Sequence, residues 1–200
     1  EHGFTFIGPK SEHIDLMDNK VTAKQTAQKM GLSVIPGSPG AVENADDGLI
    51  MAKEMGFPVI IKAASGGGGR GMKVVRSAEE FVEQYRTART EAKANFGDDV
   101  VYMEKYLEKP RHIEVQVFGD KHGNAIHLGE RDCSSQRRHQ KVIEEAPSPA
   151  LNEEQRQEIG ARAAEMVRQM GYVGAGTIEF LWENGKFYFH KLPEGKFYFF

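Results

Sequence analysis

Residues 59–72 read VIIKAASGGGGRGM, and this stretch decides the fold around it. The β-branched run at 58–63 predicts a strand, and MKVVR after the glycines predicts a second one. Four consecutive glycines carry no side chains, so backbone N–H groups can approach an anion closely. A Rossmann loop needs a helix here and a Walker A loop needs Lys before Ser or Thr, so neither motif fits. We predict a strand–loop–strand hairpin that folds over phosphates, with a mobile turn that binds nothing as the alternative.

Capping and turn signals place the other elements around this hairpin. Helices are expected where apolar residues recur at helical spacing after capping residues: 19–30, 46–55, one opened by Ser77 and Glu80, and one opened by Asn152 and Gln155. Strands are expected at 3–9, 100–107, 111–118, 125–132, 139–147, and in a hairpin of 176–182 with 186–189 around Asn184-Gly185. Residues 34–106 then form a small β-α-β-β-α-β unit beside a larger antiparallel sheet with helices. The predicted fold class is α+β, not a doubly wound parallel sheet.

The composition is typical of a folded protein. Of 200 residues, 40% are hydrophobic and 28% are charged, and the net charge of −3 gives no basic field for nucleic acid or anionic membrane. No apolar run approaches the roughly 20 residues that span a bilayer. The single cysteine, Cys133, fits a reducing compartment. The opening EHGFTFIGPK is neither a signal nor a transit peptide and lacks an initiating Met, so we expect a fragment or the mature part of a longer protein.

Two charged residues lie on otherwise apolar strands. Lys62 precedes the glycines, and a buried lysine needs an anion, so we interpret it as a phosphate clamp; a strand-edge lysine that extends to solvent is the alternative. Glu179 in GAGTIEFLW is flanked by large apolar residues and needs a cation or a donor. Two partners for Glu179 are equally favoured, a magnesium ion near phosphates and a lysine in a salt bridge.

Two further segments are polar. His112, Glu114 and Gln116 alternate with apolar residues, and a solvated strand face is the default interpretation. Residues 130–147 mix basic side chains with carboxylates, which favours a site for a small polyanion over a nucleic-acid surface or a salt-bridged surface strand. That site would use three side chains, Gln136, His139 and Lys141. The histidines have no spacing typical of a zinc site.

Four stretches together resemble biotin carboxylase, the ATP-grasp component of biotin-dependent acetyl-CoA, propionyl-CoA and pyruvate carboxylases. They are VIIKAASGGGGRGM, VYMEKYLEKPRHIEVQV, ERDCSSQRRHQKVIEEAPSP and GYVGAGTIEFLWENGKFYF, and the resemblance runs over residues 3–189. It implies an ATP-grasp core, an antiparallel sheet with helices, plus a small α+β lid subdomain. The expected divisions are the start of the core at 1–33, the lid at 34–106, the main sheet and helix at 107–189, and an atypical strand at 190–200.

The resemblance implies a two-step reaction and a role for each matching residue. ATP and bicarbonate would form carboxyphosphate, which delivers CO₂ to the ureido nitrogen of biotin. The nucleotide phosphates would contact Lys20 and Lys62 under a lid of Gly66, Gly67, Gly68, Gly69 and Gly71. The adenine hinge would be Glu104, Lys105 and Leu107, and the pocket would be completed by His112, Gln136 and His139. Lys141 would be the catalytic residue facing carboxyphosphate, and Glu179 would be one of two magnesium carboxylates.

The end of the chain departs from the family pattern. After FYF the family continues x-E-M-N-T-R-x-Q-V-E, whereas this chain continues HKLPEGKFYFF. The second magnesium Glu, the Asn, the bicarbonate-side Arg and the expected base fall on Lys191, Pro193, Gly195 and Phe199. GKFYF occurs twice, which predicts an extra strand over 196–200; engineering or chimera formation is the first explanation, ahead of a natural variant or an artefact. The alternative to an active carboxylase is therefore a truncated or engineered core that binds nucleotide without catalysis.

The resemblance also implies cofactors and partners. We expect ATP, Mg²⁺ with Mn²⁺ as the alternative ion, bicarbonate, and biotin on a carrier protein in fatty acid biosynthesis. The full-length parent would be a homodimer in the cytoplasm, with the mitochondrial matrix as the alternative compartment. Neither nucleic acid nor a membrane is an expected partner.

Overall fold

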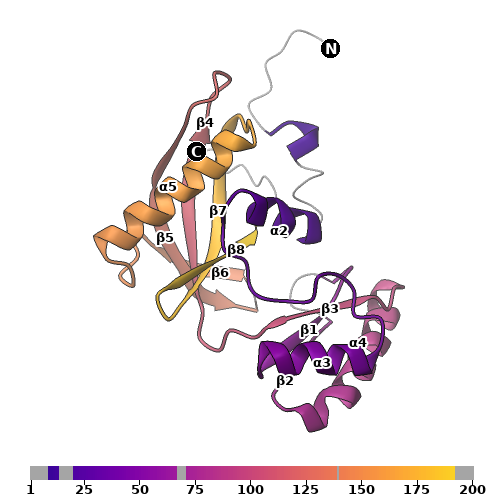
Figure 1. Cartoon of the computed structure of the whole chain (residues 1–200). Helices are drawn as coiled ribbons and strands as arrows, with labels where there is room; N and C mark the ends of the chain where they lie inside the picture. Colours follow the sequence, from indigo (N-terminus) through magenta and orange to yellow (C-terminus); the bar gives the residue numbers. More distant parts are fainter. Residues whose placement is uncertain (1–8, 14–19, 67–70, 139, 192–200) are drawn as a thin grey trace. The chain divides into compact units, whose positions relative to one another are not determined.

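The computed structural model describes residues 9–13, 20–66, 71–138 and 140–191 (Figure 1). By its internal contacts the chain divides into two units, one of residues 35–108 and one of residues 1–34 with 109–200. Each unit has a hydrophobic core of its own. Within the described ranges, no helix has the length and apolar character that a membrane span requires.

The unit of residues 35–108 is a small antiparallel sheet with two helices. Its described elements are α3 (Ala45–Met55), β1 (Val59–Ala63), β2 (Met72–Val75), α4 (Ala78–Phe96) and β3 (Val101–Lys105), with the strands in the order β2-β1-β3. The predicted hairpin is confirmed, because Met72 begins a strand that pairs with β1. The first strand of the predicted β-α-β-β-α-β unit is reduced to two isolated bridges, one between Val34 and Phe189 and one between Gly37 and Glu104. Residues 67–70 of the glycine loop lie outside the described residues.

One sheet face of this unit packs against both helices. Val59, Ile61 and Ala63 of β1 are buried in the same core as Ala52 of α3 and the inner side of α4. That side consists of the four residues predicted from helical spacing, Phe81, Tyr85, Ala88 and Ala92. The predicted Ser77–Glu80 capping box is also present, because it satisfies N–H groups that the helix cannot pair internally. Lys62 therefore lies on the opposite face of the strand.

The other unit is built on an antiparallel sheet that runs β6-β5-β4-β7-β8. Its described elements are α2 (Lys20–Lys29), β4 (Arg111–Gly119), β5 (Ala125–Arg137), β6 (Gln140–Glu145), α5 (Glu153–Gln169), β7 (Gly174–Glu183) and β8 (Lys186–Lys191). The predicted hairpin turn is confirmed by positive φ angles of 52° at Asn184 and 78° at Gly185. The predicted strand at 3–9 lies outside the described residues up to residue 8, and so does the predicted extra strand at 196–200.

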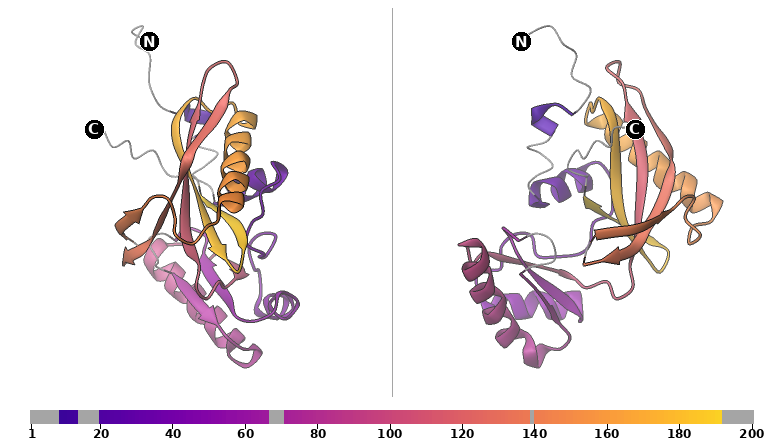
Figure 2. Two further views of the ribbon diagram at one scale, coloured as in Figure 1. Left: turned by 90° about the vertical axis from the view of Figure 1, so that its left-hand side faces the viewer. Right: turned by 180° about the vertical axis from the view of Figure 1, so that it is seen from behind.

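Helices α2 and α5 cover the same face of this sheet, as the left view of Figure 2 shows. The core between them includes Val115, Ile178 and Phe180 from the strands and Ile159 and Ala163 from α5. Bulges between Asp132 and Gln136 accompany the bend of β5 and β6 away from the helices. The α+β fold class with an antiparallel sheet is confirmed, and the alternate residues of each strand face away from α2 and α5.

Candidate functional site

A row of charged side chains crosses the sheet face that points away from the helices. Lys191 on β8 is the register partner of Glu179 on β7, which is the partner of Glu114 on β4, which is the partner of Arg131 on β5. Lys141 of β6 contacts Glu114 and completes what we call the charge row. A bulge in the β7–β8 pairing shifts the register, so Lys191 lies opposite Glu179.

Glu114 is the most enclosed member of the charge row. Its side chain is 3% exposed, and its Oε2 lies 2.9 Å from Nη2 of Arg131 while its Oε1 contacts the ammonium of Lys141. Arg131 also donates to Gln116 Oε1 at 3.1 Å and to Thr177 Oγ1 at 3.2 Å. The default interpretation of a solvated face is therefore wrong at Glu114. Burial of a carboxylate is costly unless cations pair with it, and side chains from β5 and β6 do so here.

Glu179 is buried and paired in a similar way. His112 donates from Nδ1 to Glu179 Oε1 at 2.7 Å, and Lys191 Nζ lies 3.8 Å from Oε2. Burial alone would raise the pKa of Glu179, but the His112 hydrogen bond and the charges of His190, Lys191 and Lys141 lower it to about 2. The carboxylate is therefore ionised at neutral pH. Of the two partners that the sequence favoured equally, the lysine is the one that the described residues supply.

The remaining predicted residues of this unit are Lys141, Gln136, His139 and Lys20. Burial lowers the pKa of Lys141, and the charge of Lys191 lowers it further, against the opposing effect of Glu179 and Glu144. Gln136 is the register partner of Lys141 and donates to the carbonyl of Cys133 at 3.0 Å. Burial raises the pKa of the Cys133 thiol to about 12, so the thiol is neutral. His139 lies outside the described residues. Lys20 begins α2.

The unit of residues 35–108 holds a second set of predicted residues. Lys62 Nζ and Glu104 Oε2 lie 2.6 Å apart, with side chains 18% and 3% exposed. Lys105 donates to the carbonyls of Gly56 and Phe57 at 2.9 and 3.0 Å. Leu107 follows β3 and is half-buried. Glu104 was expected as an adenine contact, and its ion pair with Lys62 was not predicted.

The glycine loop is described at its two ends, Gly66 and Gly71. Gly71 has a φ of +69°, and a Cβ there would lie 2.9 Å from the Phe96 ring and 3.0 Å from the Ala63 Cβ. Any larger residue would therefore be strained in its backbone and would clash with its neighbours. Gly67, Gly68 and Gly69 lie outside the described residues.

Comparison with known proteins identifies the family. Residues 19–192 match the family model described as carbamoyl-phosphate synthase L chain, ATP binding domain. The chain belongs to this family. The chain is 56% identical to the biotin carboxylase of Pseudomonas aeruginosa over 188 residues. The match covers 94% of this chain and 42% of that protein. The predicted resemblance to biotin carboxylase and the predicted ATP-grasp fold are confirmed.

Solved structures agree with this assignment. The biotin carboxylase of Campylobacter jejuni, solved as a β,γ-ATP complex, has a TM-score of 0.84 and 52% identity over 96% of this chain and 43% of that one. The biotin carboxylase domain dimer of Hydrogenobacter thermophilus 2-oxoglutarate carboxylase, with MgADP, ADP and bicarbonate, has a TM-score of 0.84 and 46% identity over 96% of this chain and 42% of that one. The chain thus spans about two fifths of the length of these relatives.

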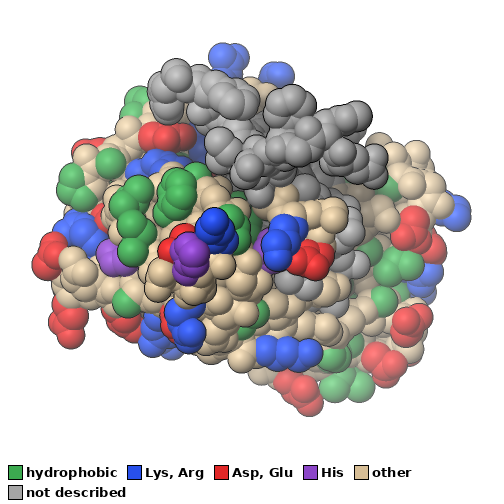
Figure 3. Space-filling model, turned by 90° about the horizontal axis from the view of Figure 1, so that it is seen from above, with side chains coloured by type: hydrophobic (Ala, Val, Ile, Leu, Met, Phe, Trp, Pro, Cys, Tyr) green, Lys and Arg blue, Asp and Glu red, His purple; other side chains and the backbone are tan. Residues whose placement is uncertain are grey.

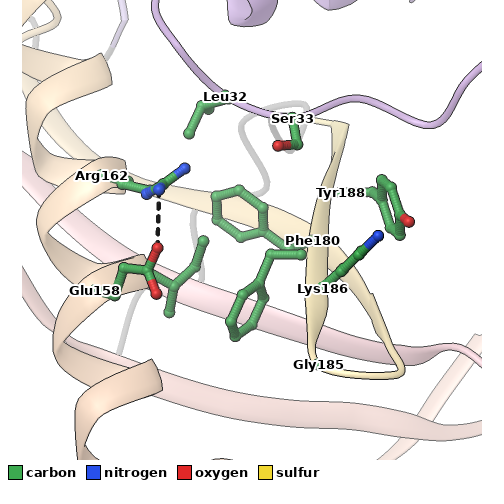
Figure 4. A pocket seen from close by; sticks show the side chains of 10 residues that line it. Leu32, Ser33, Glu158, Arg162, Phe180, Gly185, Lys186 and Tyr188 are labelled. Atoms are coloured by element: carbon green, nitrogen blue, oxygen red, sulfur yellow. Dashed lines mark ion pairs between the residues drawn. The ribbon is translucent and has the colours of Figure 1, made fainter.

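A cavity of about 210 Å³ lies on the helix side of the larger sheet (Figure 4). Phe180 lies at its apolar side, and Arg162 and Glu158 of α5 form an ion pair of 2.8 Å at its edge. None of the predicted site residues lines it. Basic side chains and histidines instead lie next to carboxylates on the outer surface, and Figure 3 shows this for one face.

Proposed function

We propose that this chain is the ATP-binding part of an enzyme that carboxylates biotin with ATP and bicarbonate. The observation that carries the proposal is the family match over residues 19–192, together with 56% identity to a biotin carboxylase. The solved relatives support ATP and bicarbonate as substrates, since one is a β,γ-ATP complex and the other holds MgADP, ADP and bicarbonate.

The proposed roles follow the charge of the side chains. Ammonium groups neutralise a transferring phosphoryl group, and a closed glycine lid excludes the water that would destroy carboxyphosphate. We assign phosphate contacts to Lys20, Lys62 and the loop Gly66–Gly69 with Gly71. We assign the nucleoside pocket to Glu104, Lys105, Leu107, His112, Gln136 and His139, and the carboxyphosphate contact to Lys141. The paired geometry of Lys62 and Lys141 supports these assignments, because each ammonium is held in place by a buried carboxylate.

Magnesium is the one proposed group that the described contacts do not fit. Mg²⁺ needs oxygen ligands in octahedral geometry, supplied by carboxylates, phosphates and water. Glu179 was predicted as such a ligand, but its two oxygens face His112 and Lys191. Among the described residues no cluster of three or more metal-binding side chains is present. Mn²⁺ in place of Mg²⁺ would meet the same contacts.

The acceptor, the oligomeric state and the compartment are also proposals. Biotin on a carrier protein is the proposed acceptor, and a homodimer is the proposed state of the full-length protein, since one solved relative is a domain dimer. A bacterial cytoplasm is the proposed compartment, because the relatives named above are bacterial proteins. The alternative of a truncated, inactive core is less favoured, since it depends largely on residues 192–200, which lie outside the described residues.

Nucleotide binding is the direct test. We expect isothermal titration calorimetry to show ATP binding to the chain, with GTP as the matched control that binds more weakly. The full-length protein should release ADP only when bicarbonate and biotin are both present. Equal affinity for GTP, or no heat with ATP, would contradict the proposed ATP-binding role.

A further inference from the structure

Two buried carboxylates are neighbours in the middle of the charge row, and the protein supplies a basic partner to every oxygen. Glu114 Oε2 lies 2.9 Å from Arg131 Nη2, and Oε1 contacts Lys141. Glu179 Oε1 lies 2.7 Å from His112 Nδ1, and Oε2 lies 3.8 Å from Lys191 Nζ. Both carboxylates are nearly inaccessible, with side chains 3% and 4% exposed.

Adjacent carboxylates on neighbouring strands repel each other unless positive charge lies between or beside them. A divalent cation is one solution, and basic side chains are another. In the charge row the two carboxylates face three permanent cations, Arg131, Lys141 and Lys191. Glu144 also lies 3.4 Å from Arg131 Nε, so three carboxylates are matched by three cations without a metal ion. A metal ion at Glu179 would have to displace its hydrogen bond with His112 or approach within a few ångströms of the Lys191 ammonium.

We propose that Lys191, rather than a divalent metal ion, neutralises Glu179 and supplies positive charge beside the phosphates of a bound nucleotide. Adenine nucleotide binding by this chain then does not need a divalent cation. The Lys191 side chain is 58% exposed, so its ammonium can contact Glu179 and still donate to a phosphate oxygen. This inference rests on the proposed nucleotide-binding function.

Calorimetry with ADP, once in excess Mg²⁺ and once in EDTA, tests the nucleotide half of the proposal. The wild-type chain should give affinities within about threefold of each other, whereas Lys191→Glu should bind at least about tenfold more tightly with Mg²⁺. Lys29→Glu is the matched control, because it makes the same charge change at an exposed position of α2, which covers the opposite face of the sheet. It should behave as wild type. A wild-type affinity that falls tenfold in EDTA, with the Mg²⁺ effect lost in Glu179→Gln, overturns the proposal.

Thermal unfolding tests the metal half without any nucleotide. Lys191→Glu places two carboxylates opposite each other, so millimolar Mg²⁺ or Mn²⁺ should raise its unfolding midpoint, while wild type and Lys29→Glu should not respond. A wild-type midpoint that rises with Mg²⁺ and no longer rises in Glu179→Gln overturns the proposal. If ADP binds under neither condition, the proposed function fails and this unfolding measurement alone decides the inference. If Lys191→Glu does not fold, Lys191→Gln serves in its place. This variant should bind ADP in EDTA about tenfold more weakly than wild type, and an unchanged affinity overturns the proposal.

Discussion

The Lys62–Glu104 ion pair sets the consequence of removing the lysine from the sheet of residues 35–108. Nζ and Oε2 lie 2.6 Å apart, with side chains only 18% and 3% exposed. At an effective dielectric constant of 20, the Coulomb attraction at this distance is about 6 kcal/mol, part of which offsets the desolvation of both charges. Lys62→Met leaves Glu104 buried without its ammonium partner. We expect the unit to lose about 3–5 kcal/mol of stability, the range for breaking one side of a buried pair.

Amide hydrogen exchange in β1 and β3 measures this loss locally, because these strands carry Lys62 and Glu104. A local measurement is needed because the chain contains a second unit that can unfold separately. Lys53→Met, at an exposed position of α3, is the matched control and should leave exchange unchanged. The double variant Lys62→Met/Glu104→Met should recover most of the stability, because the buried carboxylate is removed together with the ammonium. A double variant that is no more stable than Lys62→Met refutes the reasoning.

Two further predictions concern Glu179 and the glycine loop. The pKa of Glu179 is depressed from 4.5 to about 2, so its stabilising effect is present above the unfolded value of 4.5 and is lost as the pH falls through about 2. In Glu179→Gln, the free energy of unfolding should therefore vary less between these pH values, by a difference on the order of 3 kcal/mol, measured by urea titration at each pH. Gly71→Ala should destabilise by more than about 1 kcal/mol, because the residue has a φ of +69° and its Cβ would lie 2.9 Å from the Phe96 ring. Gly40→Ala, where a Cβ meets nothing within 4 Å, should cost less in the same urea titration, and equal costs would contradict the steric argument.

The elements that were predictable from the sequence are those that depend on local signals. The inner side of α4 follows from helical spacing over a few turns, and its start follows from one capping box. The β7–β8 hairpin follows from Asn184-Gly185, since a tight turn needs positive φ at both central residues. In each case the deciding residues are fewer than about twenty apart along the chain. Long-range packing was not needed to choose between helix and strand.

The candidate site was less predictable because its pairings join distant residues. Alternation in β4 indicates a polar face, but it does not show that Arg131 and Lys141 from two other strands close over Glu114. The same limit applies to Lys62, whose partner Glu104 lies 42 residues away. A polar residue in an otherwise apolar strand was the available signal in both cases. Register and bulges determine which charges meet, and those depend on the assembled sheet.

Lys62, a proposed phosphate contact, and Lys141, the proposed carboxyphosphate contact, share one arrangement, in which a lysine is paired with a buried glutamate. Lys62 is held by Glu104 and Lys141 by Glu114. A lysine ammonium has three donors, so it can keep its carboxylate and still donate to a phosphate oxygen. The carboxylate thereby fixes a flexible side chain before the ligand arrives, which reduces the entropy lost on binding. The pairing also avoids an uncompensated buried charge when no ligand is present, so the same contact that stabilises the sheet positions the cation for an anionic substrate.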